Sequence, residues 1–439
     1  MKKRMIQKLL CSAAVLGMMF GVIGCGASGN SEDRMQDIKP QKEAVVDVPT
    51  SENRDDNETQ EVNSKETLSE ADAVSMTDFA VRLFQQSLEE EKNTLVSPLS
   101  VISALGMTAN GANGQTLAQM EQTFGMSLPS LNQYLSSYRE ALPEKEDKYK
   151  LSMANAIWFK DVDSLTVEKA FLQTNADYYS AEVRKAPFDE STVTEINTWV
   201  SDHTDGMIPD ILNRIPEDAQ MCLVNALAFD AEWQETYYEH QVRDGIFTKE
   251  DGTTQDIELM YSEENAYLED DNAVGFMKYY ADRKYAFAAL LPEEGISVSE
   301  YADSMTGEKL NHILTNVSDR PVNAAIPKFT SEYSIEMSDV LKAMGMTDAF
   351  DAERADFSAM GHSENGNLYI SQVIHKTFIG VDELGTKAGA ATLVMMTEGC
   401  ALMKQEPIEI YLDRPFVYMI VDCEENVPVF IGVVREIEG

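Results

Sequence analysis

Cysteine is scarce in this sequence, and its placement argues against the usual metal and disulfide frameworks. The 439 residues include 5 cysteines, and no two of them are spaced as CxxC. Structural zinc sites need closely spaced Cys and His ligands, and the 5 histidines are scattered as well. A single disulfide among Cys222, Cys400 and Cys423 stays open. We expect no metal and no organic cofactor.

The motifs of common enzymes are missing too. The chain contains no GxSxG elbow, no HExxH helix, no P-loop and no strand-bound GxGxxG. Pairs of carboxylates are frequent, but a chain with 75 Asp and Glu residues contains such pairs by chance. An enzyme hypothesis therefore has no residues to rest on.

Positive charge is low as well. The chain has 35 Lys and Arg residues against 75 Asp and Glu, and its formal net charge is -40. Binding to nucleic acid depends on clustered Lys and Arg that neutralise phosphates, so we expect no nucleic-acid partner. The acidic excess is typical of a well-solvated surface.

The one long apolar run lies at the N-terminus. A basic start precedes an apolar stretch over residues 9–23, and Gly24-Cys25 follows. The run is short for a membrane span and ends in small residues, which predicts a secretion signal over residues 1–24. The ending VIGC resembles a bacterial lipobox, which implies that Cys25 is acylated and becomes the N-terminus. The alternative is an ordinary signal peptide that happens to contain Cys25.

Residues 25–68 are typical of a flexible acidic tether. They are rich in Ser, Asn, Glu, Asp and Lys and nearly free of aromatic residues. Such a segment has too little apolar surface to offset the entropy lost on ordering. A lipid at one end and a folded domain at the other predict a bacterial lipoprotein outside the cytoplasmic membrane, attached to it through the lipid alone. We expect this protein to be a monomer.

The remaining residues, 69–439, have the pattern of an α+β domain. Apolar residues first recur at the 3.6-residue period of helices, and short β-prone runs bounded by Pro, Asp or Gly dominate later. One late exception is a helix predicted over residues 335–346. The regular strand-helix alternation of two α/β lobes is absent, which argues against a solute-binding receptor.

Longer strings in this domain resemble the signature segments of the serpins in order and spacing. The resemblance covers about residue 68 to the C-terminus. It rests on SPLSVISAL at 97, ANAIWF at 154, INTWVSDHTDGMI at 196, LVNALAFDAEW at 223, PKFTSEYSIEMSDVLKAMGMTDAF at 327, ADFSAM at 355, SQVIHKTFIGVDELGTKAGAAT at 371 and DRPFVYMIVDCEENVPVFIGVV at 413.

This resemblance implies a fold of three β-sheets with eight or nine helices and an exposed reactive-centre loop. It also implies a single-use inhibitor of serine proteases, or alternatively of cysteine proteases. The protease cuts the loop and forms an acyl-enzyme, and the loop then inserts as a new strand into the central sheet. A serpin that has lost insertion and acts as a surface binding protein is the alternative.

The segment DELGTKAGAATLVMM at 382–396 matches the hinge from which insertion starts. Small side chains suit a segment that must slide between strands about 4.8 Å apart. By the resemblance the hinge begins at Gly385, and the inward-facing side chains are those of Thr386, Ala388, Ala390 and Thr392. The chain departs from the family pattern at Lys387 and Gly389, which fall on the outward face. The small inward residues favour inhibition over simple binding.

Two further groups follow from the resemblance. Ser97, Ser100, Asn225 and His375 match the shutter, a polar cluster beneath the central sheet. Trp233 matches the breach, where the loop first enters the sheet.

The reactive bond has two competing placements. Counting from Gly385 by the family spacing puts it between Gly399 and Cys400, with Glu398 as a neighbouring alternative. Counting back from DRPF moves it toward Leu402, Met403 or Lys404, because this loop is a few residues longer than is typical.

Overall fold

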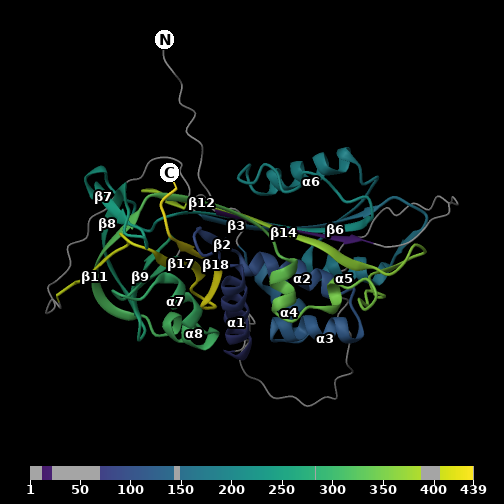
Figure 1. The fold of residues 1–439 in the computed structure, drawn as a ribbon, viewed down its shortest axis with the longest axis horizontal. Coiled ribbons are helices and arrows are strands. Elements are labelled where there is room, and N and C mark those ends of the chain that lie inside the picture. Colours follow the sequence, from purple (N-terminus) through teal and green to yellow (C-terminus); the bar gives the residue numbers. More distant parts are fainter. Residues whose placement is uncertain (1–11, 22–69, 143–148, 282, 387–405, 439) are drawn as a thin grey trace, which may run out of the picture.

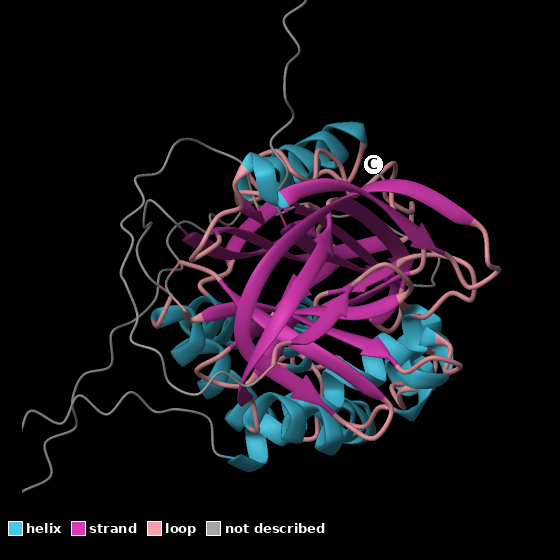
Figure 2. Ribbon diagram, turned by 90° about the vertical axis from the view of Figure 1, so that its left-hand side faces the viewer, coloured by secondary structure: helices cyan, strands magenta, loops and turns pink. Residues whose placement is uncertain are grey.

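The computed structural model describes residues 12–21, 70–142, 149–281, 283–386 and 406–438. These residues form nine α-helices and three β-sheets, so the predicted α+β fold with three sheets and eight or nine helices is confirmed. Figure 1 shows a long central sheet with helices on both faces and a second, strand-rich body at one end. Figure 2 shows strands that cross one another in the middle of the molecule, with helices above and below them.

The central sheet has seven strands. Along its path lie β12 (Phe329–Glu336), β14 (Tyr369–Val381), β1 (Ser12–Gly21), β6 (Ala219–Glu232), β3 (Tyr149–Lys160) and β5 (Glu182–Ala186), and the two-residue β15 (Gly385–Thr386) also pairs with β6. The strand position between β6 and β14 is called the central position below.

A second sheet of nine strands builds the other body. In order it contains β16 (Ile408–Tyr411), β11 (Ser318–Pro327), β8 (Thr254–Glu269), β9 (Ala273–Tyr279), β10 (Tyr285–Pro292), β17 (Phe416–Asp422), β18 (Val427–Val434) and β2 (Thr94–Val96), with β7 (Val242–Thr248) paired to β8. A two-stranded sheet joins β4 (Leu165–Val167) and β13 (Gly361–Ser363).

Helices cover the sheets unequally. Helix α6 lies alone over one face of the central sheet, while the helices that precede it in the chain gather beneath the other face (Figure 1). The helices are α1 (Glu70–Ser87), α2 (Pro98–Ala109), α3 (Gly114–Phe124), α4 (Leu128–Glu140), α5 (Lys169–Tyr179), α6 (Glu190–His203), α7 (Val298–Ser304), α8 (Gly307–Thr315) and α9 (Ser338–Ala343).

The predicted helix over residues 335–346 is shorter in the structure. Ile335 and Glu336 end strand β12 by pairing with His375 and Ile374 of β14, and α9 starts at Ser338. The apolar residues that follow still face the core, because Met337 and Leu341 are fully buried. Pairing with β14 therefore overrides the helical period at the N-terminal end of this segment.

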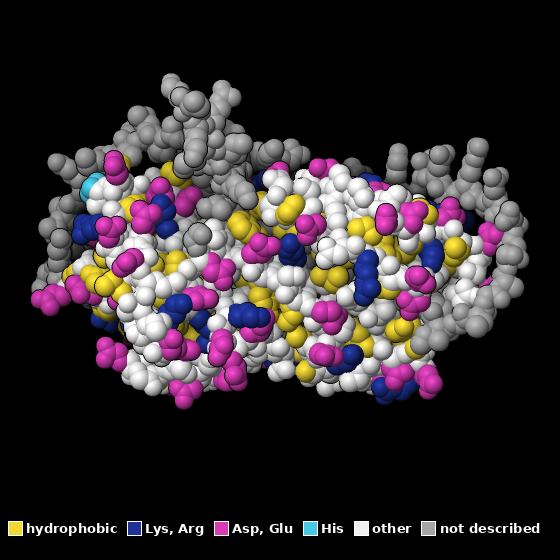
Figure 3. Space-filling model, turned by 45° about the horizontal axis from the view of Figure 1, so that its top comes forward, with side chains coloured by type: hydrophobic (Ala, Val, Ile, Leu, Met, Phe, Trp, Pro, Cys, Tyr) yellow, Lys and Arg dark blue, Asp and Glu magenta, His cyan; other side chains and the backbone are white. Residues whose placement is uncertain are grey.

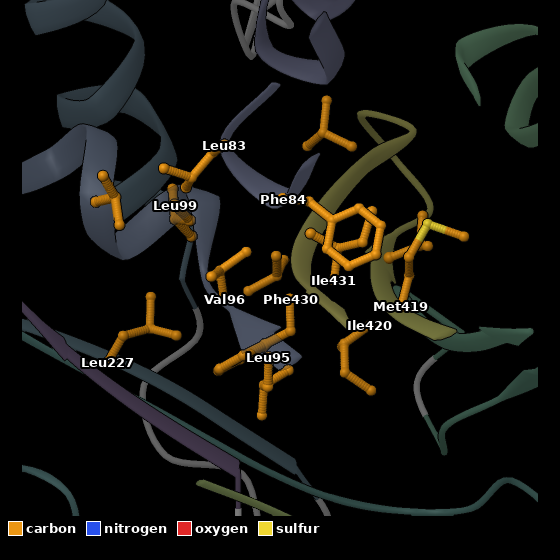
Figure 4. Close-up of a cluster of buried hydrophobic side chains, with 14 of the residues drawn as sticks. Leu83, Phe84, Leu95, Val96, Leu99, Leu227, Met419, Ile420, Phe430 and Ile431 are labelled. Carbon is orange, nitrogen blue, oxygen red and sulfur yellow. The ribbon is translucent and has the colours of Figure 1, made fainter. Parts of the chain in front are cut away.

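The hydrophobic core is divided by the central sheet. Part of the larger cluster lies between α1, α2 and the second sheet, and Figure 4 labels Phe84, Leu99 and Ile431 among its side chains. The smaller cluster lies between the central sheet and α6 and includes Trp158 and Trp199. A strand in the central sheet is thus buried on both faces.

Strand β1 comes from the apolar run at the N-terminus, where the sequence predicts a secretion signal. It fills the central position and runs antiparallel to both β6 and β14 (purple in Figure 1). Processing after Gly24 stays a prediction, and Cys25 and the tether lie outside the described residues. In a chain that has lost residues 1–24, β1 is no longer part of this sheet.

One face of the molecule carries acidic and basic side chains side by side. On the face that Figure 3 shows, Asp and Glu side chains alternate with Lys and Arg. In the described part of the chain, no helix has the length and hydropathy needed to cross a membrane.

Candidate functional site

A tight turn places the first hinge residues in the sheet. The Asp382 carboxylate accepts hydrogen bonds from the backbone N–H groups of Leu384 (2.8 Å) and Gly385 (3.2 Å). Gly385 and Thr386 then pair with Glu232 and Ala231 of β6. A Cβ atom on Gly385 would lie 2.0 Å from the backbone oxygen of Ala231, so glycine is required by this close approach.

Trp233 holds this turn against the end of β6. Its indole Nε1–H donates to the backbone oxygen of Asp382 (2.9 Å), and its backbone N–H donates to that of Leu384 (2.9 Å). The indole also stacks on the ring of Tyr280, with centroids 4.6 Å apart. The predicted breach residue therefore touches the first turn of the hinge directly.

The side chain of Thr386 is fully buried at this point. Its hydroxyl lies 2.6 Å from the Tyr280 hydroxyl. Burial raises the pKa of Tyr280, so this phenol stays neutral and is able to donate a hydrogen bond. The hinge thus starts with a small polar side chain whose single hydroxyl is paired inside the protein.

A buried ion pair lies beneath the same turn. The Lys278 ammonium is 2.9 Å from Glu264 Oε1, and both side chains are largely buried. The ammonium also lies over the rings of Tyr237 (4.5 Å) and Trp233 (5.5 Å). Aromatic faces and a carboxylate together offset the desolvation of the ammonium. Sequence reasoning missed Lys278 and Tyr280, since only the fold brings β9 beside β6.

The four predicted shutter residues lie together under the sheet. Ser97, the N-cap of α2, donates its backbone N–H to His375 Nε2 on β14 (3.1 Å). Its hydroxyl donates to the backbone oxygen of Val429 on β18 (2.9 Å). Because Nε2 accepts, the imidazole of His375 is neutral with its proton on Nδ1.

The second half of this group reaches β6 and β3. The Ser100 hydroxyl donates to Asn225 Oδ1 (2.6 Å), and Asn225 Nδ2–H donates to Asn155 Oδ1 on β3 (2.9 Å). Asn155 Nδ2–H in turn donates to the backbone oxygen of Tyr179 at the end of α5 (2.9 Å). Helix α2 is therefore bonded to β14 through Ser97 and to β6 through Ser100.

Strand β1 crosses directly above this polar group. Leu16 pairs with Asn225 on one side and with His375 on the other. The two strands that flank the central position are thus both bonded to α2 at the level of Leu16.

The other predicted site residues lie outside the described residues. These are the hinge positions Ala388, Ala390 and Thr392, the reactive-bond candidates Glu398, Gly399, Cys400, Met403 and Lys404, and the lipidation site Cys25. Their roles stay predictions. Within the described residues no group of three His, Cys, Asp or Glu side chains is placed to hold a metal ion.

The comparisons with known proteins agree with this geometry. The family model described as Serpin (serine protease inhibitor) matches residues 74–437. The chain is 47% identical to the thermophilic serpin Tengpin in its native state, with a TM-score of 0.79. The match covers 85% of this chain and 96% of the Tengpin chain. It is 30% identical over 380 residues to human (Homo sapiens) Serpin B9, covering 84% of this chain and 98% of the relative.

A more distant structure shows the same fold only. Thyroxine-binding globulin, solved as a complex with thyroxine, is 22% identical to this chain with a TM-score of 0.71. The match covers 84% of this chain and 99% of the globulin chain.

Replacing Ser100 by Ala is expected to lower the free energy of unfolding by roughly 1–3 kcal/mol. The change leaves Asn225 Oδ1 buried without its donor, which costs about that much. Urea unfolding followed by circular dichroism measures the effect. Ser103→Ala is the matched control, because Ser103 is a buried serine of α2 whose hydroxyl bonds to the backbone oxygen of Leu99 within the same helix. Equal losses in the two variants would contradict a special role of the Ser100–Asn225 bond.

The hinge turn is expected to lose stability as pH rises through the acid range. Burial raises the pKa of Asp382 in the folded protein above its usual 3.8, and the nearby Glu383 adds to the rise. The folded state therefore binds the proton more tightly, so this stabilisation is complete below pH 3.8 and is lost as pH rises through the higher folded value. The Asp382→Asn variant should lack this loss in unfolding titrations at successive pH values.

Asp251 supplies a control of opposite sign. Hydrogen bonds from Thr253 hold the pKa of this exposed carboxyl below 3.8, so its contribution is present above 3.8 and is lost as pH falls. The measured quantity is the difference in unfolding free energy between wild type and each variant as pH changes. If the Asp382→Asn difference shows a contribution that is lost as pH falls, as expected for Asp251→Asn, the expected behaviour of Asp382 is wrong.

Proposed function

Because this chain belongs to the serpin family, many of whose members are protease inhibitors rather than catalytic enzymes, we propose that it traps proteases as covalent acyl complexes. The proposed targets are serine proteases, or alternatively cysteine proteases. The trap works once per molecule, because the cleaved loop inserts into the central sheet. The observation that supports this proposal is where the hinge begins. Gly385 and Thr386 pair with the C-terminal end of β6, at one end of the central position between β6 and β14.

In the proposed reaction the protease supplies the chemistry and this chain supplies the bait. The protease hydroxyl adds to the carbonyl of the reactive bond, the carbon-nitrogen bond breaks, and the departing amine takes a proton. The carbonyl stays esterified to the protease. Insertion of the loop behind Thr386 then carries the acylated end along the sheet and distorts the protease before water completes hydrolysis.

The sheet accounts for the free energy that this movement requires. A strand of ten residues pairs antiparallel with both β6 and β14 at the central position. At about 0.5–1.5 kcal/mol net for each backbone hydrogen bond, a new strand there contributes on the order of 10 kcal/mol. Burial of its side chains on both faces adds to this. Pairing along both edges of the central position therefore favours insertion of the loop.

The same proposal places the protein on the outer face of a bacterial membrane. It rests on the lipobox-like VIGC and on the acidic tether over residues 25–68. Processing after Gly24 would leave a lipid on Cys25 and would take β1 out of the central position. The inhibitor would then stand away from the membrane, with the central position open to its loop.

A non-inhibitory surface binding protein is the second candidate. A polar cavity of about 580 Å³ beside the ion pair of Lys278 and Glu264 is the observation in its favour. Thyroxine-binding globulin shares the fold and was solved with thyroxine bound. In this reading the loop is cut as an ordinary substrate and does not insert.

Trapping is tested with the chain that starts at residue 25, mixed with elastase-like, trypsin-like, chymotrypsin-like, glutamyl-specific and subtilisin-like proteases. We expect a complex of the summed mass on denaturing gels, and mass spectrometry of the released peptide names the reactive bond. Thr386→Arg should abolish the complex while the loop is still cut, because the buried site offers the cation no partner. Lys387→Arg, predicted to face outward, is the control that keeps trapping. Cleavage by every protease without a complex or a gain in thermal stability would favour the binding protein.

Lipidation is tested separately in a bacterial host that processes lipoproteins. Wild type is expected to partition into the detergent phase and to lose its amino-terminal 24 residues, whereas Cys25→Ser should stay in the aqueous phase. Mass spectrometry of the N-terminal peptide gives the acyl mass. Cys11→Ser is the matched control, because Cys11 lies within the predicted signal and should not affect partitioning. A wild type cleaved elsewhere and free of lipid would support the ordinary signal peptide.

A further inference from the structure

Residues 12–21 form a strand in the very position that the proposed mechanism reserves for the loop. We propose that this segment acts as an autoinhibitory strand, so that a chain that retains it is unable to trap proteases until residues 1–24 are removed. This inference rests on the proposed inhibitory function. It assigns the N-terminal segment a role in the folded protein in addition to any role in secretion.

The register of the sheet carries the first step. Thr386 of β15 pairs with Ala231 of β6, and β15 is antiparallel to β6. Continuing that pairing one residue at a time assigns Ala388 to Phe229. Phe229 is the β6 residue with which Ser12 already pairs, also in an antiparallel sense. β1 therefore lies in line with β15, with the direction and register that the inserted loop would need.

The backbone of β1 is paired along both edges. Gly17 pairs with Val224 of β6 and with Ile374 of β14, and this pattern runs through almost the whole strand. The Ser371 hydroxyl adds a hydrogen bond of 3.0 Å to the backbone oxygen of Met19. A second strand finds no free edge at this position while β1 is present.

The described side chains of β1 fill both faces of the sheet. Met18 is fully buried toward α2, where the Thr108 hydroxyl lies 3.1 Å from its sulfur. Met19 points to the opposite face and is buried in the cluster under α6. At Gly17 an added Cβ would lie 3.5 Å from Ile211, so this position is closely covered as well. These contacts are those of a packed core strand.

The order of events favours β1 over the loop. Residues 22–69 link β1 to α1 and at about 3.3 Å per residue are long enough to let it reach the central position. β1 also needs no prior cleavage, whereas the loop must be cut before it is free to enter. Removal of the segment is therefore the step that opens the central position.

The test uses the full chain made in a membrane-free translation system, which leaves residues 1–24 attached. Met18→Asp places a carboxylate in the core and should expel β1, because burial of a carboxylate is costly and the nearby Thr108 hydroxyl does not neutralise its charge. Met5→Asp is the matched control, since it adds the same charge outside β1. We expect the amides of residues 12–21 to be protected from hydrogen exchange in wild type and in Met5→Asp, and to exchange rapidly in Met18→Asp.

Function is then compared in the same three chains. With a protease that the chain starting at residue 25 is able to trap, Met18→Asp should form the complex at least about tenfold faster than wild type or Met5→Asp. Cleavage of the loop should raise the melting temperature of Met18→Asp but not that of the other two. Rapid exchange of residues 12–21 in wild type, or equal trapping by all three chains, would overturn the inference.

A second variant guards against misfolding of Met18→Asp. Gly17→Pro removes a backbone N–H from the ladder without adding a charge, and it should give the same loss of protection. Failure of the proposed function itself has a different signature. In that case no chain forms a complex, including the one that starts at residue 25, while the exchange of residues 12–21 still decides whether the strand occupies the sheet.

Discussion

The facing edges of β6 and β14 carry backbone N–H and C=O groups that lie in the interior and favour hydrogen-bond partners. Helix α6 and its cluster lie on one side of these edges and the main core on the other, so water does not reach them freely. One strand at the central position pairs both edges at once. A segment of suitable length and extended backbone satisfies the same hydrogen bonds whether it comes from the N-terminus or from the loop. The sheet itself therefore does not determine which of the two segments fills the central position.

Polar contacts beneath the sheet determine how firmly its strands are held. His375 on β14 and Asn225 on β6 lie at one level, and both are bonded to α2 through serines. These bonds are buried, so separating the strands leaves polar atoms without partners. The free-energy cost of a buried unpaired polar atom is larger than the net free energy that its hydrogen bond contributes. The hinge turn at the upper end depends instead on Asp382 and on the indole of Trp233. Opening of the sheet and entry of the hinge are thus controlled by separate groups of bonds.

Much of this arrangement is predictable from sequence, but for two different reasons. The fold class follows from the order of helical and strand-like periods, whereas the grouping of Ser97, Ser100, Asn225 and His375 follows only from the family strings. Contacts made by Lys278 and Tyr280 were not predicted, because nothing near β9 in the sequence marks its proximity to the hinge. The place of β1 was missed for a physical reason. An apolar run of this length suits a signal segment and a doubly buried strand equally well, and periodicity does not separate them.

The ion pair of Lys278 and Glu264 adds a thermal property to the hinge. Hydration of charged groups becomes less favourable on heating, so the desolvation penalty of a buried pair falls as temperature rises. Hydrophobic contacts around it gain nothing comparable over the same range. The aromatic floor under Trp233 is consequently held by a contact that strengthens in relative terms with heat. The end of β6 at which the hinge is fixed thus rests partly on a contact whose relative weight grows with temperature.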